Sequence, residues 1–156
     1  MTTPTLVLKV NTIFDLTRFA KTQFPQHLPD YYLLLKGETS KMPSDIKFKI
    51  NIQNQTSEFL GLYGQLVLNN VNGSSFPYFY MVLVASKKFN LSQKTSDYTP
   101  ATNIIKEFKS QEDVDILIIR QYTTSTGGYH TNSNTMRQII SDGISVSENA
   151  VNNLLK

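Results

Sequence analysis

The chain has 156 residues, a length typical of one domain with a continuous apolar core. Apolar residues make up 40% of it and charged residues 17%, which excludes a chain that is disordered along most of its length. Cysteine is absent, which excludes disulfides, thiolate metal sites and cysteine nucleophiles. The formal net charge of +3 tolerates an anionic partner, but lysine and arginine gather only in twos and threes.

The sequence carries no recognisable targeting or membrane signal. It lacks a basic N-terminal segment followed by a long apolar one, and no stretch approaches the roughly 20 apolar residues of a membrane span. We therefore expect a cytoplasmic protein that does not act in a membrane. Export without a signal peptide, or assembly into a virus particle, is compatible with the same sequence.

The N-terminal part predicts a strand, a helix and a second strand. Thr5 to Val10 alternates loosely and is predicted as a short strand. The capping-box spacing of Thr12 and Asp15 predicts a helix from about Ile13 to Phe24. Tyr31 to Leu35 is an apolar run too short for a typical helix, so it is predicted as a strand buried on both faces or covered by a helix.

The central part carries the strongest pattern in the chain. Large apolar residues alternate with polar ones from Ile46 to Ile52, which places the apolar side chains on one face of a strand. A strand is predicted from about Glu58 to Leu68, with a bulge or bend at Gly61 and Gly64. After an asparagine- and glycine-rich turn, Phe76 to Ala85 returns as a third strand, and the three form an antiparallel meander.

The C-terminal part predicts a loop, two helical segments and a strand. Asn90 to Tyr98 is polar and is predicted as a loop, and Thr99 with Pro100 predicts a helix that extends to about Lys109. Val114 to Tyr122 is predicted as the last strand. The tail from Asn134 has helical spacing, with a break expected at Gly143.

These elements predict a single α+β domain over residues 1–156. Its antiparallel meander sheet has about five strands, and three to four helices pack mainly on one face. No internal repeat is present.

The best candidate for a ligand site is the loop that follows the last predicted strand, because it runs towards a helix N-terminus where backbone amides hold anions. Its candidate ligand-binding residues are Arg120, Tyr122, Thr124, Ser125, Tyr129 and His130. No known phosphate-loop motif is present, and the helix begins several residues after the glycines. A polar loop whose hydroxyls cap the next helix accounts for the same residues.

A second candidate surface is aromatic and basic. Tyr78 and Tyr80 lie on one side of their strand, and Lys47 and Lys49 lie on the polar side of a predicted neighbour. Such groups on one sheet face stack bases and hold phosphates of a single-stranded nucleic acid. We prefer burial of the tyrosines under a helix, since their strand is apolar on both sides and no nucleic-acid-binding motif accompanies them.

No residues are predicted as catalytic, and the sequence contains no cofactor motif. His27 and His130 are the only histidines, which excludes a histidine-rich metal site. We therefore expect a small non-catalytic binding protein that holds a protein partner through a sheet edge, hairpin tips or the 120–131 loop. The alternatives are an enzyme or anion binder centred on that loop, a single-stranded nucleic-acid-binding protein, and a structural subunit of an assembly. The sequence indicates neither the partner's identity nor the oligomeric state.

Overall fold

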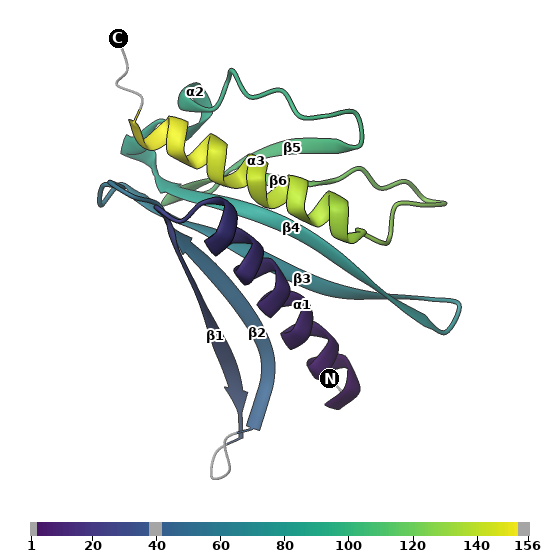
Figure 1. Ribbon diagram of the computed structural model, residues 1–156. Helices are drawn as coiled ribbons and strands as arrows, with labels where there is room; N and C mark the ends of the chain where they lie inside the picture. Colours follow the sequence, from purple (N-terminus) through teal and green to yellow (C-terminus); the bar gives the residue numbers. More distant parts are fainter. Residues whose placement is uncertain (1–2, 38–41, 153–156) are drawn as a thin grey trace.

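The computed structural model describes residues 3–37 and 42–152 (Figure 1). Three helices and six strands follow each other along this part of the chain, with one short 3-10 helix, η1, between β4 and α2. The elements are α1 (Thr3–Gln23), β1 (Leu28–Lys36), β2 (Met42–Asn51), β3 (Phe59–Val71), β4 (Ser74–Ser86), η1 (Lys87–Phe89), α2 (Leu91–Lys94), β5 (Ile104–Ser110), β6 (Val114–Gln121) and α3 (Ser133–Asn152).

The strands form one antiparallel sheet in the order β1-β2-β3-β4-β6-β5. β1 and β5 are its two edges. α1 and α3 lie side by side on one face of the sheet, α1 against β2 and α3 against β4 (Figure 1). No helix of the described residues covers the other face, which we call the open face. The predicted α+β class is confirmed, with six strands where about five were expected.

The core lies between this sheet and the two long helices. The two-residue pattern from Ile46 to Ile52 is confirmed, because its four apolar side chains are at most 3% exposed and face the helices. In β4 the side chains of Phe79, Met81 and Leu83 point to the same face of the sheet and are fully buried. Among the described residues, no helix is both long and apolar enough to span a bilayer.

The strand predicted from Thr5 to Val10 is wrong, because this segment belongs to α1. Thr12 does not cap the helix. Its Oγ1 donates a hydrogen bond to the carbonyl oxygen of Leu8 at 2.8 Å, one turn earlier within the same helix. Ile13 and Leu16 then bury the helix against the sheet, and this packing outweighs the weak helix propensity of the β-branched residues.

The strand at Tyr31 to Leu35 is confirmed, but its predicted burial is wrong. β1 is an edge of the sheet, and Tyr31, Leu33 and Leu35 are 45%, 47% and 54% exposed. A continuous apolar run usually marks an interior strand. Here the run stays at the surface of the single chain.

The helix predicted from Thr99 to Lys109 is also wrong. Its second half is β5, which pairs with β6 and buries Ile104 at the start of the strand. Pairing with an apolar neighbour therefore overrides the local helix-start signal of Thr99 and Pro100. The predicted loop from Asn90 to Tyr98 contains the one-turn helix α2, anchored by the buried side chain of Leu91.

The break expected at Gly143 is absent, since α3 runs without interruption from Ser133 to Asn152. A Cβ atom at Gly143 would lie 3.3 Å from the Met81 side chain and 3.4 Å from that of Leu62. The glycine therefore lets the helix approach the sheet closely instead of ending the helix.

Gly64 provides a stability test of this packing. An added Cβ would lie 2.0 Å from Cε1 of Phe48, whose fully buried ring has little room to move. We expect Gly64→Ala to lower the free energy of unfolding by about 1–3 kcal/mol, measured by urea denaturation. Gly127→Ala is the control, because the nearest atom to its added Cβ is 3.9 Å away. Equal losses in the two variants would contradict the packing described here.

Candidate functional site

Large exposed apolar side chains concentrate on α1 and β1. A few such side chains scattered over a surface are ordinary, but a contiguous group marks an interaction site. The exposed group consists of Val7, Leu8 and Phe14 on α1 and of Leu28, Tyr31, Leu33, Leu34 and Leu35 on β1, where Leu28 and Leu34 point to the open face. We call it the apolar edge.

A groove runs between α1 and β1. Tyr31 and Leu33 pair with Phe48 and Ile46 of β2, so their side chains point to the same face of the sheet as α1. The rings of Tyr31 and Phe14 meet with their centroids 4.9 Å apart. The groove has a volume of about 380 Å³, and its lining is Leu6, Val7, Val10, Asn11, Phe14, Tyr31, Leu33 and Ile46. It is an almost wholly apolar depression beside β1, the edge strand of the sheet.

The two edges of the sheet differ in chemistry. No strand in residues 3–37 or 42–152 pairs with the outer side of β1. Proteins usually protect such an edge with charges, proline or bulges. β5 follows this rule with Lys106, Glu107 and Lys109. β1 has Pro29 near its start and a register shift against β2 between Leu34 and Leu35, but no charged residue between Asp30 and Lys36. The middle of β1 is therefore suited to pair with another strand.

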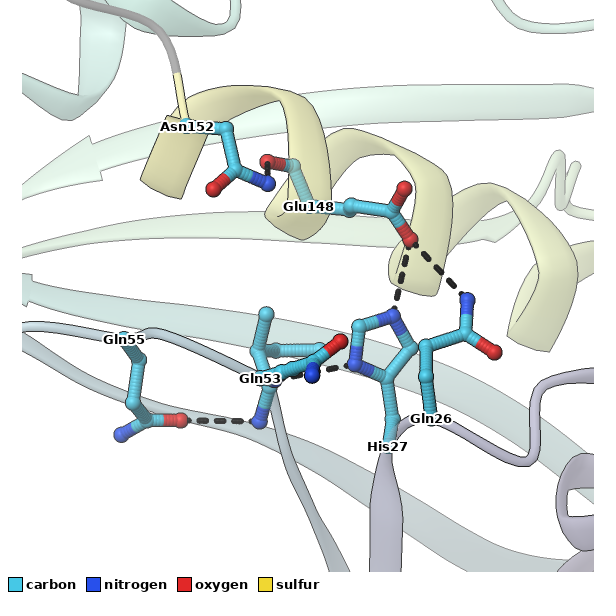
Figure 2. Close-up of polar contacts among 7 residues, drawn as sticks. Gln26, His27, Gln53, Gln55, Glu148 and Asn152 are labelled. Atoms are coloured by element: carbon cyan, nitrogen blue, oxygen red, sulfur yellow. Dashed lines mark hydrogen bonds and ion pairs between the residues drawn. The ribbon is translucent and has the colours of Figure 1, made fainter.

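The start of β1 is held by His27, for which the sequence predicted no role (Figure 2). The ring is 2% exposed, and its Nδ1 accepts a hydrogen bond from the backbone N–H of Gln53 at 3.0 Å. Nε2 lies 2.8 Å from Oε2 of Glu148 on α3. Because Nδ1 accepts, the neutral ring carries its proton on Nε2 and donates it to the carboxylate. One side chain thus joins the beginning of β1 to the turn after β2 and to α3.

The residues of the predicted loop site do not converge on one cavity. Arg120 lies on β6, where its Nε is 3.7 Å from Oε1 of Glu107, and the Tyr122 side chain is exposed. His130 is exposed too, with its ring centroid 6.0 Å from that of Phe76.

The polar groups in the middle of the loop contact one another. The Thr124 N–H donates to the Gly127 carbonyl oxygen at 2.9 Å, and the Tyr129 hydroxyl donates to the Ser125 carbonyl oxygen at 2.5 Å. Asn132, just after the loop, caps α3. Its Oδ1 accepts the Thr135 N–H at 2.9 Å. These contacts favour the interpretation of a structural polar loop, and a ligand there stays a prediction.

The aromatic and basic candidates share the open face of the sheet. The register across β2, β3 and β4 places Lys47, Lys49, Tyr78 and Tyr80 opposite the helices, so burial of the tyrosines under a helix is wrong. Tyr78 is nevertheless buried by its neighbours. Its hydroxyl donates to the Gln121 carbonyl oxygen at 2.6 Å. The ring of Tyr78 is therefore poorly placed to stack on a base.

A larger cavity, of about 660 Å³, lies between α3 and the segment that follows α2. It is open and polar, and the Tyr98 hydroxyl in its wall donates to Oδ2 of Asp142 at 2.7 Å. Burial, together with this hydrogen bond, raises the pKa of Tyr98, so the hydroxyl stays protonated. Within the described ranges, no group of three or more histidine, aspartate or glutamate side chains is placed to hold a metal ion.

Comparison of the chain with protein-family models, with curated proteins and with solved structures finds no match. The function is therefore inferred from the surface of this chain alone. On that surface, the apolar edge is the feature that the packing of a single molecule explains least.

His27 provides the second test. We expect His27→Ala to lower the free energy of unfolding by about 1–3 kcal/mol, because the Gln53 N–H and the Glu148 carboxylate lose a partner. Relative to the natural sequence, the substitution should increase the rate of hydrogen exchange more in β1 than in β4. His130→Ala, at an exposed histidine, is the control. A uniform change across the sheet would exclude a local role for His27.

Asp115 on β6 provides a pH test. The Lys87 ammonium donates to its Oδ1 at 2.8 Å, and this hydrogen bond is the main reason why the pKa of Asp115 lies below its ordinary value. The ionised form therefore stabilises the fold fully above the ordinary pKa of 3.8, and this contribution is lost as the pH falls through the lower pKa of the folded state.

We expect Asp115→Asn to lower the free energy of unfolding by about 1 kcal/mol at pH 7 and to weaken its decline in acid. Urea denaturation between pH 7 and roughly pH 2 measures both effects. Asp113→Asn, at an exposed neighbouring carboxylate, is the control. An unchanged acid dependence in Asp115→Asn would show that the ion pair does not contribute.

Proposed function

We propose that this protein is a non-catalytic interaction protein whose apolar edge binds an extended apolar segment of a protein partner. The carrying observation is the coincidence of an edge strand that is uncharged along its middle with an apolar groove beside it. In this mode the partner adds a strand to the sheet. Main-chain hydrogen bonds to β1 provide affinity, and side chains in the groove provide selectivity.

The groove lies on the correct side of β1 for this mode. Alternate side chains of an added strand point to the same face as Tyr31 and Leu33, and therefore towards Phe14 and Val7 on α1. A segment with apolar residues at every second position would place them against this helix. The low charge of the chain favours short-range apolar contact over long-range steering.

The rival functions have less support from the same structure. On the open face, the Tyr78 hydroxyl is engaged and Arg120 lies beside Glu107, so fewer rings and cations are free for a nucleic acid. The pKa values of Tyr80 and Tyr98 are raised, chiefly by burial, and that of Asp115 is lowered. Each of these shifts moves the group away from the neutral pKa that suits general acid and base catalysis.

Leu33→Lys tests the proposed function, because it places a charge at the middle of the apolar edge. The probe is a set of short synthetic peptides with apolar residues at alternate positions, and binding is followed through the backbone amide shifts of the protein. We expect the shifts to cluster on β1 and α1, and the affinity to fall about tenfold or more in Leu33→Lys, because a buried lysine needs a partner.

Val67→Lys is the matched control, since Val67 is a 40% exposed aliphatic residue on β3, away from the apolar edge. It should bind the peptides as well as the natural sequence does. Peptide shifts that map to the open face or to the 120–131 loop would disprove the proposed site.

A further inference from the structure

We infer that the segment bound by the apolar edge is β1 of a second copy of this chain, paired antiparallel to form a two-fold dimer with one continuous sheet. The inference rests on the proposed function, because it uses the same strand and the same groove. It names the partner that the chemistry of β1 itself selects.

The sequence of β1 allows two copies of the strand to pair antiparallel with matching side chains. Its exposed residues Asp30 and Lys36 flank the apolar run from Tyr31 to Leu35, and Leu33 lies at the middle of this segment. In an antiparallel pair centred on Leu33, Asp30 of each copy lies opposite Lys36 of the other. Tyr31 lies opposite Leu35 of the second copy. Two side chains of opposite charge that face each other across paired strands stabilise the pairing, and so do two apolar side chains in the same position.

Other registers lose this match. Moving the centre of the pair by one residue towards the N-terminus sets Asp30 opposite Leu34 of the second copy, and parallel pairing sets the Asp30 carboxylates of the two copies close together. A carboxylate against leucine gains no ion pair, and neighbouring like charges repel. Charge thus selects the register, which a purely apolar strand leaves weakly specified.

The two-fold arrangement also keeps the two grooves on one side of the joined sheet. Its axis is perpendicular to the sheet, so both copies direct Tyr31 and Leu33 towards their helices and both direct Asp30 towards the open face. Leu33 of the second copy then lies beside the groove that Phe14 and Val7 border. Apolar surface is covered on the helix side, while the ion pairs lie on the open face.

Sedimentation equilibrium over a range of protein concentrations tests the inference. We expect a monomer–dimer equilibrium whose dissociation constant rises about tenfold in Asp30→Lys and in Lys36→Asp, because each single reversal creates two like-charged pairs across the axis. The double variant Asp30→Lys/Lys36→Asp restores opposite charges and should return within about threefold of the natural sequence. Lys109→Glu, on the other edge strand, is the control and should leave the equilibrium unchanged.

The outcomes separate this inference from the proposed function. A chain that stays monomeric but binds the alternating peptides through β1 overturns the dimer and leaves the proposed function standing. A dimer that is indifferent to both single reversals, or that the double variant does not restore, also overturns the inferred pairing. Leu33→Lys without effect on either dimerisation or peptide binding overturns both.

Discussion

The contact of Phe48 with Phe79 across Gly64 is the interaction on which the arrangement of this protein depends. β2 pairs with β3 only through Phe48, Lys49 and Ile50, so few main-chain hydrogen bonds join the first two strands to the rest of the sheet. Phe48 lies opposite Gly64, and its ring continues over the glycine to stack on Phe79 with the centroids 5.9 Å apart. The Phe48 side chain fills the space that Gly64, which has no side chain, leaves on the neighbouring strand. Among the described residues, β1 pairs with no strand other than β2, so its place in the sheet depends on this contact, while α1 packs against it from one side.

Much of the sheet could be predicted because its strands carry their own pattern. The alternation from Ile46 to Ile52 has a period that only a strand with one buried face explains, and it needs no knowledge of the neighbouring strands. β5 and the start of α1 could not be predicted in this way. Thr99 with Pro100 and Thr12 with Asp15 are valid local signals, but strand pairing and helix packing decide these segments from elsewhere in the chain.

The place of the candidate site could not be predicted from the sequence. A protein partner was expected at a sheet edge, at hairpin tips or at the 120–131 loop, whereas Tyr31 to Leu35 was predicted to be buried. An apolar run looks the same whether a helix, a sheet or another molecule covers it. His27 gave no signal either. Its partners, Gln53 and Glu148, lie far along the chain, and no spacing rule connects them.

The charged residues of β5 have a consequence for the size of any assembly. A sheet with two similar unprotected edge strands can add further molecules at both edges and grow into a fibre. The two edges of this sheet differ, because β5 carries the charged residues Lys106, Glu107 and Lys109 and the middle of β1 is apolar. In the inferred dimer, both outer edges of the joined sheet are charged β5 strands, so a third molecule finds no apolar edge to pair with and the assembly ends at two molecules.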